Sequence, residues 1–307
     1  MNSQVLINKL FDKLLSPSVK ERSERLILTI AIISYIIHLL LIILVNQEII
    51  QLESKLFSNP IAAIYTPFSF ILLYEVYLLV FFLPKSITTY IGKQYEIITL
   101  IVIRRIFKDI ANLELDSDWF QNRYDLQFTY DVATALILFV LIYFFYQRNN
   151  QKEFLPGGLS PETFKKITRF INLKKAVAIA LLPIFVILAC YTLFTWVSET
   201  LYDYQNGILA FENINNIFFD EFFTVLIIID VLLLLFSFFY SDEFHKIIRN
   251  SGFVISTMLI KISFSEKGLV NNALIIGAVL FGYLILLIHN MYENQKEIIT
   301  PPKSNSS

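Results

Sequence analysis

The segment Ile71-Leu-Leu-Tyr-Glu75-Val-Tyr-Leu-Leu-Val-Phe-Phe82 decides the fold of this chain. It belongs to a longer apolar block over residues 61–83 and contains one charged residue, Glu75. A helix rises 1.5 Å per residue, so about 20 apolar residues cross the hydrocarbon core of a bilayer. The block therefore predicts a transmembrane helix with a carboxylate near its middle.

Similar blocks recur along the whole chain. Of its 307 residues, 56% are hydrophobic and 17% are charged, against about 25% charged residues in soluble domains. The blocks predict an all-α polytopic transmembrane protein with eight spans, at 25–46, 61–83, 93–108, 129–147, 174–197, 218–240, 249–265 and 270–291. The third and seventh spans are short and charged, but without them basic loops would lie on both sides of the membrane.

The basic residues predict the orientation. Most of the 25 Lys and Arg residues fall in segments on the same side as the N-terminus, chiefly 1–24 and 148–173. On the opposite side, loop 198–217 has no Lys or Arg, and loop 109–128 is rich in Asp and Glu. Because basic loops stay in the cytoplasm, both termini are expected there.

The same pattern divides the chain into five parts. Residues 1–24 carry Leu6, Leu10, Phe11 and Leu14 at helical spacing and predict an amphipathic helix on the membrane surface. Segment 148–173 is a linker, in which Ser160-Pro161-Glu162 predicts the start of a short helix ending near 172. The division is 1–24, a first four-helix bundle over 25–147, the linker 148–173, a second four-helix bundle over 174–292, and a disordered tail over 293–307.

The two membrane units resemble each other in the order of their polar residues. Each has an acid in its second span, a base in its third, and a polar residue at the start of its fourth. These are Glu75, Arg104–Arg105 and Asp131 in the first unit, and Asp230, Lys261 and Asn272 in the second. Because each unit crosses four times, the copies have the same orientation, which predicts a parallel duplication.

Charges within spans are the candidate functional residues, because each costs about 2.5–3.5 kcal/mol at the bilayer centre. Glu75 and Arg104 lean toward each other, but a depth difference of roughly 10–15 Å predicts a water-bridged pair rather than a direct one. Asp131 is placed to pair with Arg104 or Arg105, and His38 lies at an intermediate depth. Two interpretations stay open: ion pairs that join the helices, or an ion path in which Glu75 takes up a proton.

No catalytic, cofactor or metal pattern is recognisable, so no enzyme is predicted. The single cysteine, Cys190, is expected to be buried and structural. His245 and His289 flank spans and are interpreted as interfacial. A net charge of −1 predicts no nucleic-acid partner. The expected partner is the lipid bilayer, with a small ion and a second copy of the chain left open.

The first unit resembles the phosphate-starvation-inducible PsiE family of bacterial four-helix membrane proteins over residues 25–147. The resemblance rests on Tyr74-Glu75, on Ile98-Thr99-x-Ile101-x-Ile103-Arg104, and on Asp131-Val132. The stretch between Arg104 and Asp131 is longer than in the family, and the second unit is a degenerate copy. The resemblance implies a cytoplasmic-membrane location and a role in stress or phosphate limitation, without a mechanism.

Two hypotheses for the function follow. In the first, a bacterial inner-membrane protein conducts or responds to an ion or proton through Glu75, Arg104 and Asp131. In the second, the protein is a scaffold or sensor that acts through segments 1–24 and 148–173.

Overall fold

The computed structural model describes residues 3–50, 60–110, 123–149, 161–202, 207–240 and 243–299, and all its regular elements in these ranges are helices. They are α1 (Ser3–Leu14), α2 (Pro17–Asn46), the 3-10 helix η2 (Pro60–Ile64), α3 (Tyr65–Phe82), α4 (Ile87–Ile110), α5 (Arg123–Asn149), α6 (Pro161–Tyr202), α7 (Gly207–Phe238), α8 (Phe244–Ser263) and α9 (Gly268–Ile299).

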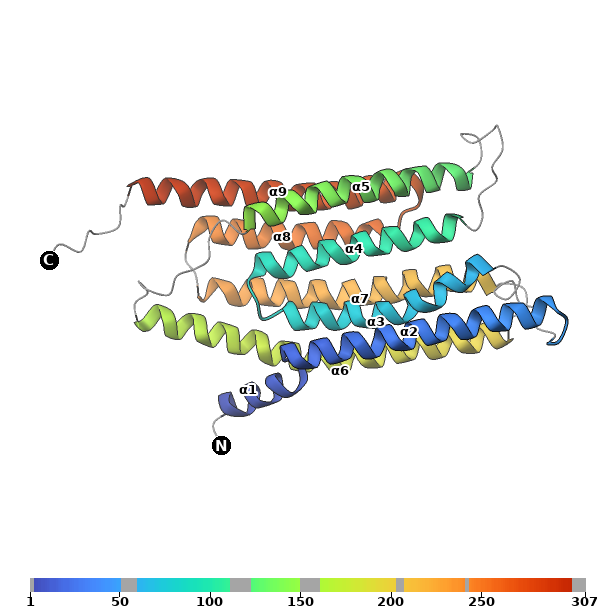
Figure 1. Cartoon of the computed structure of the whole chain (residues 1–307). Helices are drawn as coiled ribbons and strands as arrows, with labels where there is room; N and C mark the ends of the chain where they lie inside the picture. The colour runs from blue at the N-terminus through green and yellow to red at the C-terminus, as the bar shows by residue number, and fades with distance from the viewer. Residues whose placement is uncertain are drawn as a thin grey trace.

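Helices α2 to α9 run side by side along a common axis, and α1 lies against the bundle at one end (Figure 1). Helices from the two predicted units are in contact: α5 packs along α9, α3 against α6, and α4 against α8. The two units therefore share one core, although two successive bundles were expected.

Five helices in the described ranges are long and apolar enough to cross a membrane, and they lie in α2, α5, α6, α7 and α9. Helix α3 contains a shorter apolar stretch, Thr66–Phe82. The predicted third and seventh spans are the helices α4 and α8, which carry more charge. The described chain is thus an all-helical protein with several apolar helices suited to a multi-pass membrane protein.

The outer faces of the bundle are apolar. Large hydrophobic side chains that are at least half exposed occur on three of the outer helices: Ile32, Ile33, Ile36, Ile37 and Leu40 on α2, Leu136, Phe139, Val140 and Tyr143 on α5, and Val186, Ile187 and Tyr191 on α6. Contiguous apolar surface of this kind is rare on soluble monomers. In lipid it costs nothing, because acyl chains are as apolar as leucine.

Polar side chains are concentrated inside. Helices α4 and α8 lie between the outer helices in Figure 1 and bury Gln94, Thr99, Arg104, Ser256 and Thr257. Hydrogen-bonding groups in hydrocarbon need partners from neighbouring helices. The low apolarity of these two helices is therefore explained by their interior position.

Three predicted boundaries differ in the structure. Helix α6 begins at Pro161, as expected, but continues unbroken to Tyr202 through the predicted end of the short helix near 172. Helix α7 begins at Gly207, so most of the predicted loop 198–217 is helical. Helix α9 extends to Ile299 into the predicted tail, of which 300–307 lie outside the described residues.

The N-terminal segment is divided between α1 and the start of α2, a division that was not predicted from the sequence. Ser16 caps α2 by accepting a hydrogen bond from the Val19 amide at 3.3 Å, and Pro17 occupies the first turn. Helix α1 docks on α6, where Lys175 donates to Asn8 at 2.9 Å and lies over the Phe11 ring. The predicted amphipathic helix is therefore held against the bundle.

Cys190 is exposed on α6, so the expectation that it is buried was wrong. The expectation relied on the preference of thiols for protein interiors in water. Around a membrane helix, lipid offers the same apolar environment as the interior, and that preference disappears.

A tight three-helix contact fixes the centre of the bundle. Tyr95 of α4 is fully buried and its hydroxyl lies 2.8 Å from the hydroxyl of Ser256 on α8. Gly282 of α9 faces this pair: a Cβ atom there would overlap the Tyr95 hydroxyl and lie 3.3 Å from the Ser256 hydroxyl oxygen. The absence of a side chain at 282 therefore allows α9 to approach.

We expect Gly282→Ala to lower the free energy of unfolding by about 1–3 kcal/mol, because the enclosed Tyr95 ring has no room to move. Gly277→Ala, on the same helix with no atom within 4 Å of its Cβ, should be neutral or stabilising by up to about 1 kcal/mol. Denaturant titration in detergent micelles measures both. Equal stability of the two variants would contradict this packing.

Candidate functional site

The predicted pair between Glu75 and Arg104 is direct. Glu75 on α3 is 1% exposed and Arg104 on α4 is 8% exposed, and the guanidinium contacts the carboxylate. The prediction of a water-bridged pair was wrong. The arginine side chain is long enough to cover the difference in depth, because the side chains of the two antiparallel helices lean toward each other. Each charge is thus neutralised inside the bundle.

A second network surrounds Asp131 on α5, which is 0% exposed. Its Oδ1 accepts hydrogen bonds from Arg105 at 3.2 Å, from Gln127 at 2.9 Å and from Asn272 at 2.7 Å. Three charged or amide donors on one carboxylate oxygen stabilise its ionised form. The donors come from α4, α5 and α9, so the network joins three helices.

The Asp131 network also joins the two predicted units. Asn272 donates to Asp131 and its Oδ1 accepts from Arg105 at 2.9 Å. Asn271 also accepts a hydrogen bond from Arg105, and it donates to the Ser263 carbonyl of α8. Asn272, the predicted counterpart of Asp131 in the second unit, therefore belongs to the same cluster as Asp131. The sequence had predicted that the two residues lie in separate bundles.

The other predicted residues lie at different places. His38 of α2 is buried and lies 2.5 Å from the Thr66 hydroxyl of α3. Lys261 is partly buried near the end of α8. Among the predicted residues, Glu75 contacts Arg104, and Arg105 contacts Asp131 and Asn272.

Asp230, the second-unit acid, lies in a third polar cluster. Gln94 of α4 donates to Asp230 of α7 at 3.1 Å and accepts from Thr257 of α8 at 2.8 Å. A cavity of about 30 Å³ lies beside Asp230 and is also lined by Tyr90, Lys174 and Asn250. This volume holds one or two water molecules. Gln94 and Thr257 are not among the residues that the sequence predicted for the site.

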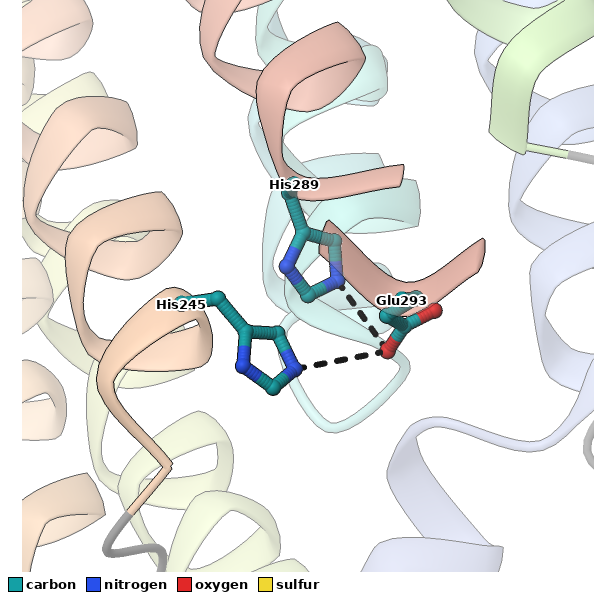
Figure 2. Close-up of side chains that lie close together, drawn as sticks. All are labelled: His245, His289 and Glu293. Carbon is teal, nitrogen blue, oxygen red and sulfur yellow. Dashed lines mark ion pairs between the residues drawn. The ribbon is translucent and has the colours of Figure 1, made fainter. Parts of the chain in front are cut away.

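A fourth cluster lies where α8 begins and α9 approaches its end. His245 of α8 stacks on His289 of α9 with 5.1 Å between ring centroids, and both imidazoles face the Glu293 carboxylate (Figure 2). His289 and Glu293 are four residues apart and so share one helix face, a spacing visible in the sequence. The partner His245 is distant in sequence, and the interfacial interpretation missed the grouping.

Comparison of the chain with protein-family models, with curated proteins and with solved structures finds no match. The PsiE-like resemblance of residues 25–147 therefore stays a prediction.

The Asp131 network generates a stability prediction. Asp131→Ala leaves the Arg105 guanidinium without its buried counter-charge and should cost about 3–5 kcal/mol. Adding Arg105→Leu removes that uncompensated charge. The double variant should therefore lose less stability than the sum of the losses of the two single variants. Denaturant titration of the purified protein in micelles measures all three.

The exposed pair Glu21–Arg25, with side chains 66% and 83% exposed, provides the control. Glu21→Gln should change the stability by less than about 0.5 kcal/mol. Strict additivity of the Asp131 and Arg105 changes would show that the two side chains do not interact.

Proposed function

We propose that this chain is an eight-span inner-membrane protein of a bacterium, built from two duplicated units with both ends in the cytoplasm. In this proposal its paired interior charges respond to, or conduct, a small ion, with the proton as the first candidate. The observation that carries the proposal is the set of buried, partnered carboxylates Glu75, Asp131 and Asp230 within apolar helices.

These buried charges lower the stability of the bundle, so they are expected to serve a purpose besides packing. Paired intramembrane charges are expensive relative to apolar side chains of similar volume. A protein that needs only helix packing can use small or apolar residues at these positions. Carboxylates paired with arginine can also respond to protons. Protonation of the acid releases the arginine and so changes which helices are joined.

The eight-span layout is part of the proposal. It adds α3, α4 and α8 to the five helices that are long and apolar enough to cross. Support comes from the direct pairing of α3 with α4 through Glu75 and Arg104, and of α4 with α5 through Arg105 and Asp131. A helix joined in this way to apolar neighbours shares their depth in the bilayer.

A scaffold or sensor function is the second candidate, and it is favoured by the docking of α1. The Tyr77 hydroxyl donates to the Leu14 carbonyl at 3.1 Å, and Lys175 bonds to Asn8. A cytoplasmic partner that bound α1 would thereby act on α3 and α6. Neither function involves catalysis. The PsiE-like motifs support phosphate limitation as the growth condition for the test of this second function.

The layout predicts opposite sides for the two ends of α8. In a Cys190→Ser background, Lys246→Cys should be protected from a membrane-impermeant maleimide in intact spheroplasts, and Ser265→Cys should react. After permeabilisation both should react. If only Lys246→Cys is labelled in intact spheroplasts, the orientation is the reverse of the one proposed. If both cysteines are labelled, α8 does not cross the membrane.

The ion hypothesis predicts flux through the purified protein. In liposomes containing a pH-sensitive dye, an imposed membrane potential should drive acidification, and Glu75→Gln should abolish it because the amide cannot exchange a proton. Glu266→Gln, at an exposed position beyond α8, should retain the wild-type rate.

Absence of wild-type flux under proton, sodium and potassium gradients would contradict the ion-conducting function. The sensor function then requires that Phe11→Ala with Lys175→Ala, which releases α1, abolish growth complementation in phosphate-limited cells. Unchanged complementation would contradict the sensor function.

A further inference from the structure

We infer that His245, His289 and Glu293 form a binding site for a divalent first-row transition-metal ion, with zinc as the reference ion. The three side chains come from the first turn of α8 and from the last third of α9 (Figure 2). This site is separate from the intramembrane charges discussed above, and it does not depend on the function proposed for them.

The positions of the ligand atoms fit a small metal ion. The Glu293 Oε1 atom lies 3.3 Å from Nε2 of His289 and 4.0 Å from Nε2 of His245, and one ligand atom from each residue lies within 4.8 Å of the others. Bonds of about 2.0–2.2 Å in a tetrahedral zinc site put neighbouring ligand atoms about 3.4 Å apart. The distance between Glu293 and His289 already fits this spacing, and His245 would move closer to Glu293 to complete it.

The hydrogen bonding of His289 favours a cation at this point. The Arg249 guanidinium lies 2.9 Å from Nε2 of His289. The same nitrogen lies 3.3 Å from the Glu293 carboxylate. A metal ion held by this nitrogen and by Glu293 would take the place of the Arg249 cation at this point.

Arg249 has other partners besides His289. Its Nε and one terminal nitrogen donate to Asn250 Oδ1, at 3.2 and 3.1 Å. An incoming metal ion would replace only the contact with His289 and would leave the two bonds to Asn250. The metal would thus bind three side chains that the fold already brings within 4.8 Å of one another.

The ligand types define the class of ion. Two imidazoles and one carboxylate suit zinc and neighbouring transition metals, whereas magnesium and calcium prefer oxygen ligands. Both histidines are buried, with exposures of 8% and 4%. The Glu293 side chain is 26% exposed and provides the route of entry. Glu243, whose Oε2 is 3.1 Å from Nε2 of His245, is placed to take the fourth position or to hold a water there.

The test uses the full-length protein in detergent after removal of any affinity tag. Titration with zinc by calorimetry, and with cobalt by visible absorption, should show one equivalent bound with the intense bands of tetrahedral coordination. Magnesium and calcium at the same concentrations should not compete. Zinc should raise the melting temperature of the wild-type protein, because it binds only the folded state.

The decisive variant is His245→Gln with His289→Gln, which should weaken zinc binding by about 100-fold or more, since loss of supporting residues alone costs 10–100-fold. Glu266→Gln, exposed at the opposite end of α8, should bind like wild type. If the double variant is misfolded by circular dichroism, Glu293→Gln alone must reduce the affinity at least tenfold. Wild-type protein that binds no zinc, or variants that bind it unchanged, would overturn the inference.

Discussion

The structure depends on the neutralisation of two adjacent arginines inside an apolar bundle. Consecutive residues of a helix point about 100° apart, so Arg104 and Arg105 of α4 face different neighbours. Arg104 reaches Glu75 on α3, and Arg105 reaches Asp131 on α5 and Asn272 on α9. Helix α4 is thereby bonded to helices on both sides, and its interior position follows from the need to pair both charges.

The same network explains why position 272 carries an amide and not an acid. A carboxylate at position 272 would face Asp131 across the interior and would repel it. The amide of Asn272 both donates to Asp131 and accepts from Arg105, which an ionised acid cannot do. An uncharged side chain at position 272 is thus a condition for packing α9 against α5. In the proposed duplication, the two units could share one core only after their charges had diverged.

The sequence predicted the helical class, most helix positions, a pair between Glu75 and Arg104 that was expected to be water-bridged, and a pair of Asp131 with either Arg104 or Arg105. These predictions succeed because apolar periodicity and charges in lipid are strong local signals. The contact between the units was not predictable in this way, because the approach of α9 to Tyr95 of α4 depends on Gly282, and both residues are ordinary within their own segments. The His245–His289 stack was missed for a related reason: its members lie on two helices whose register only the three-dimensional packing fixes.

The unbroken length of α6 has a mechanical consequence. Its 42 residues extend over about 63 Å at 1.5 Å per residue, roughly twice the thickness of a hydrocarbon core. Pro183 lies inside the helix and removes one backbone hydrogen bond, so α6 bends most easily there. The turns before Pro183 move together, and the Phe170 ring packs on Tyr240 just after α7, with 5.2 Å between ring centroids. A rotation of the described part of the predicted linker, residues 161–173, would therefore be carried to the end of α7.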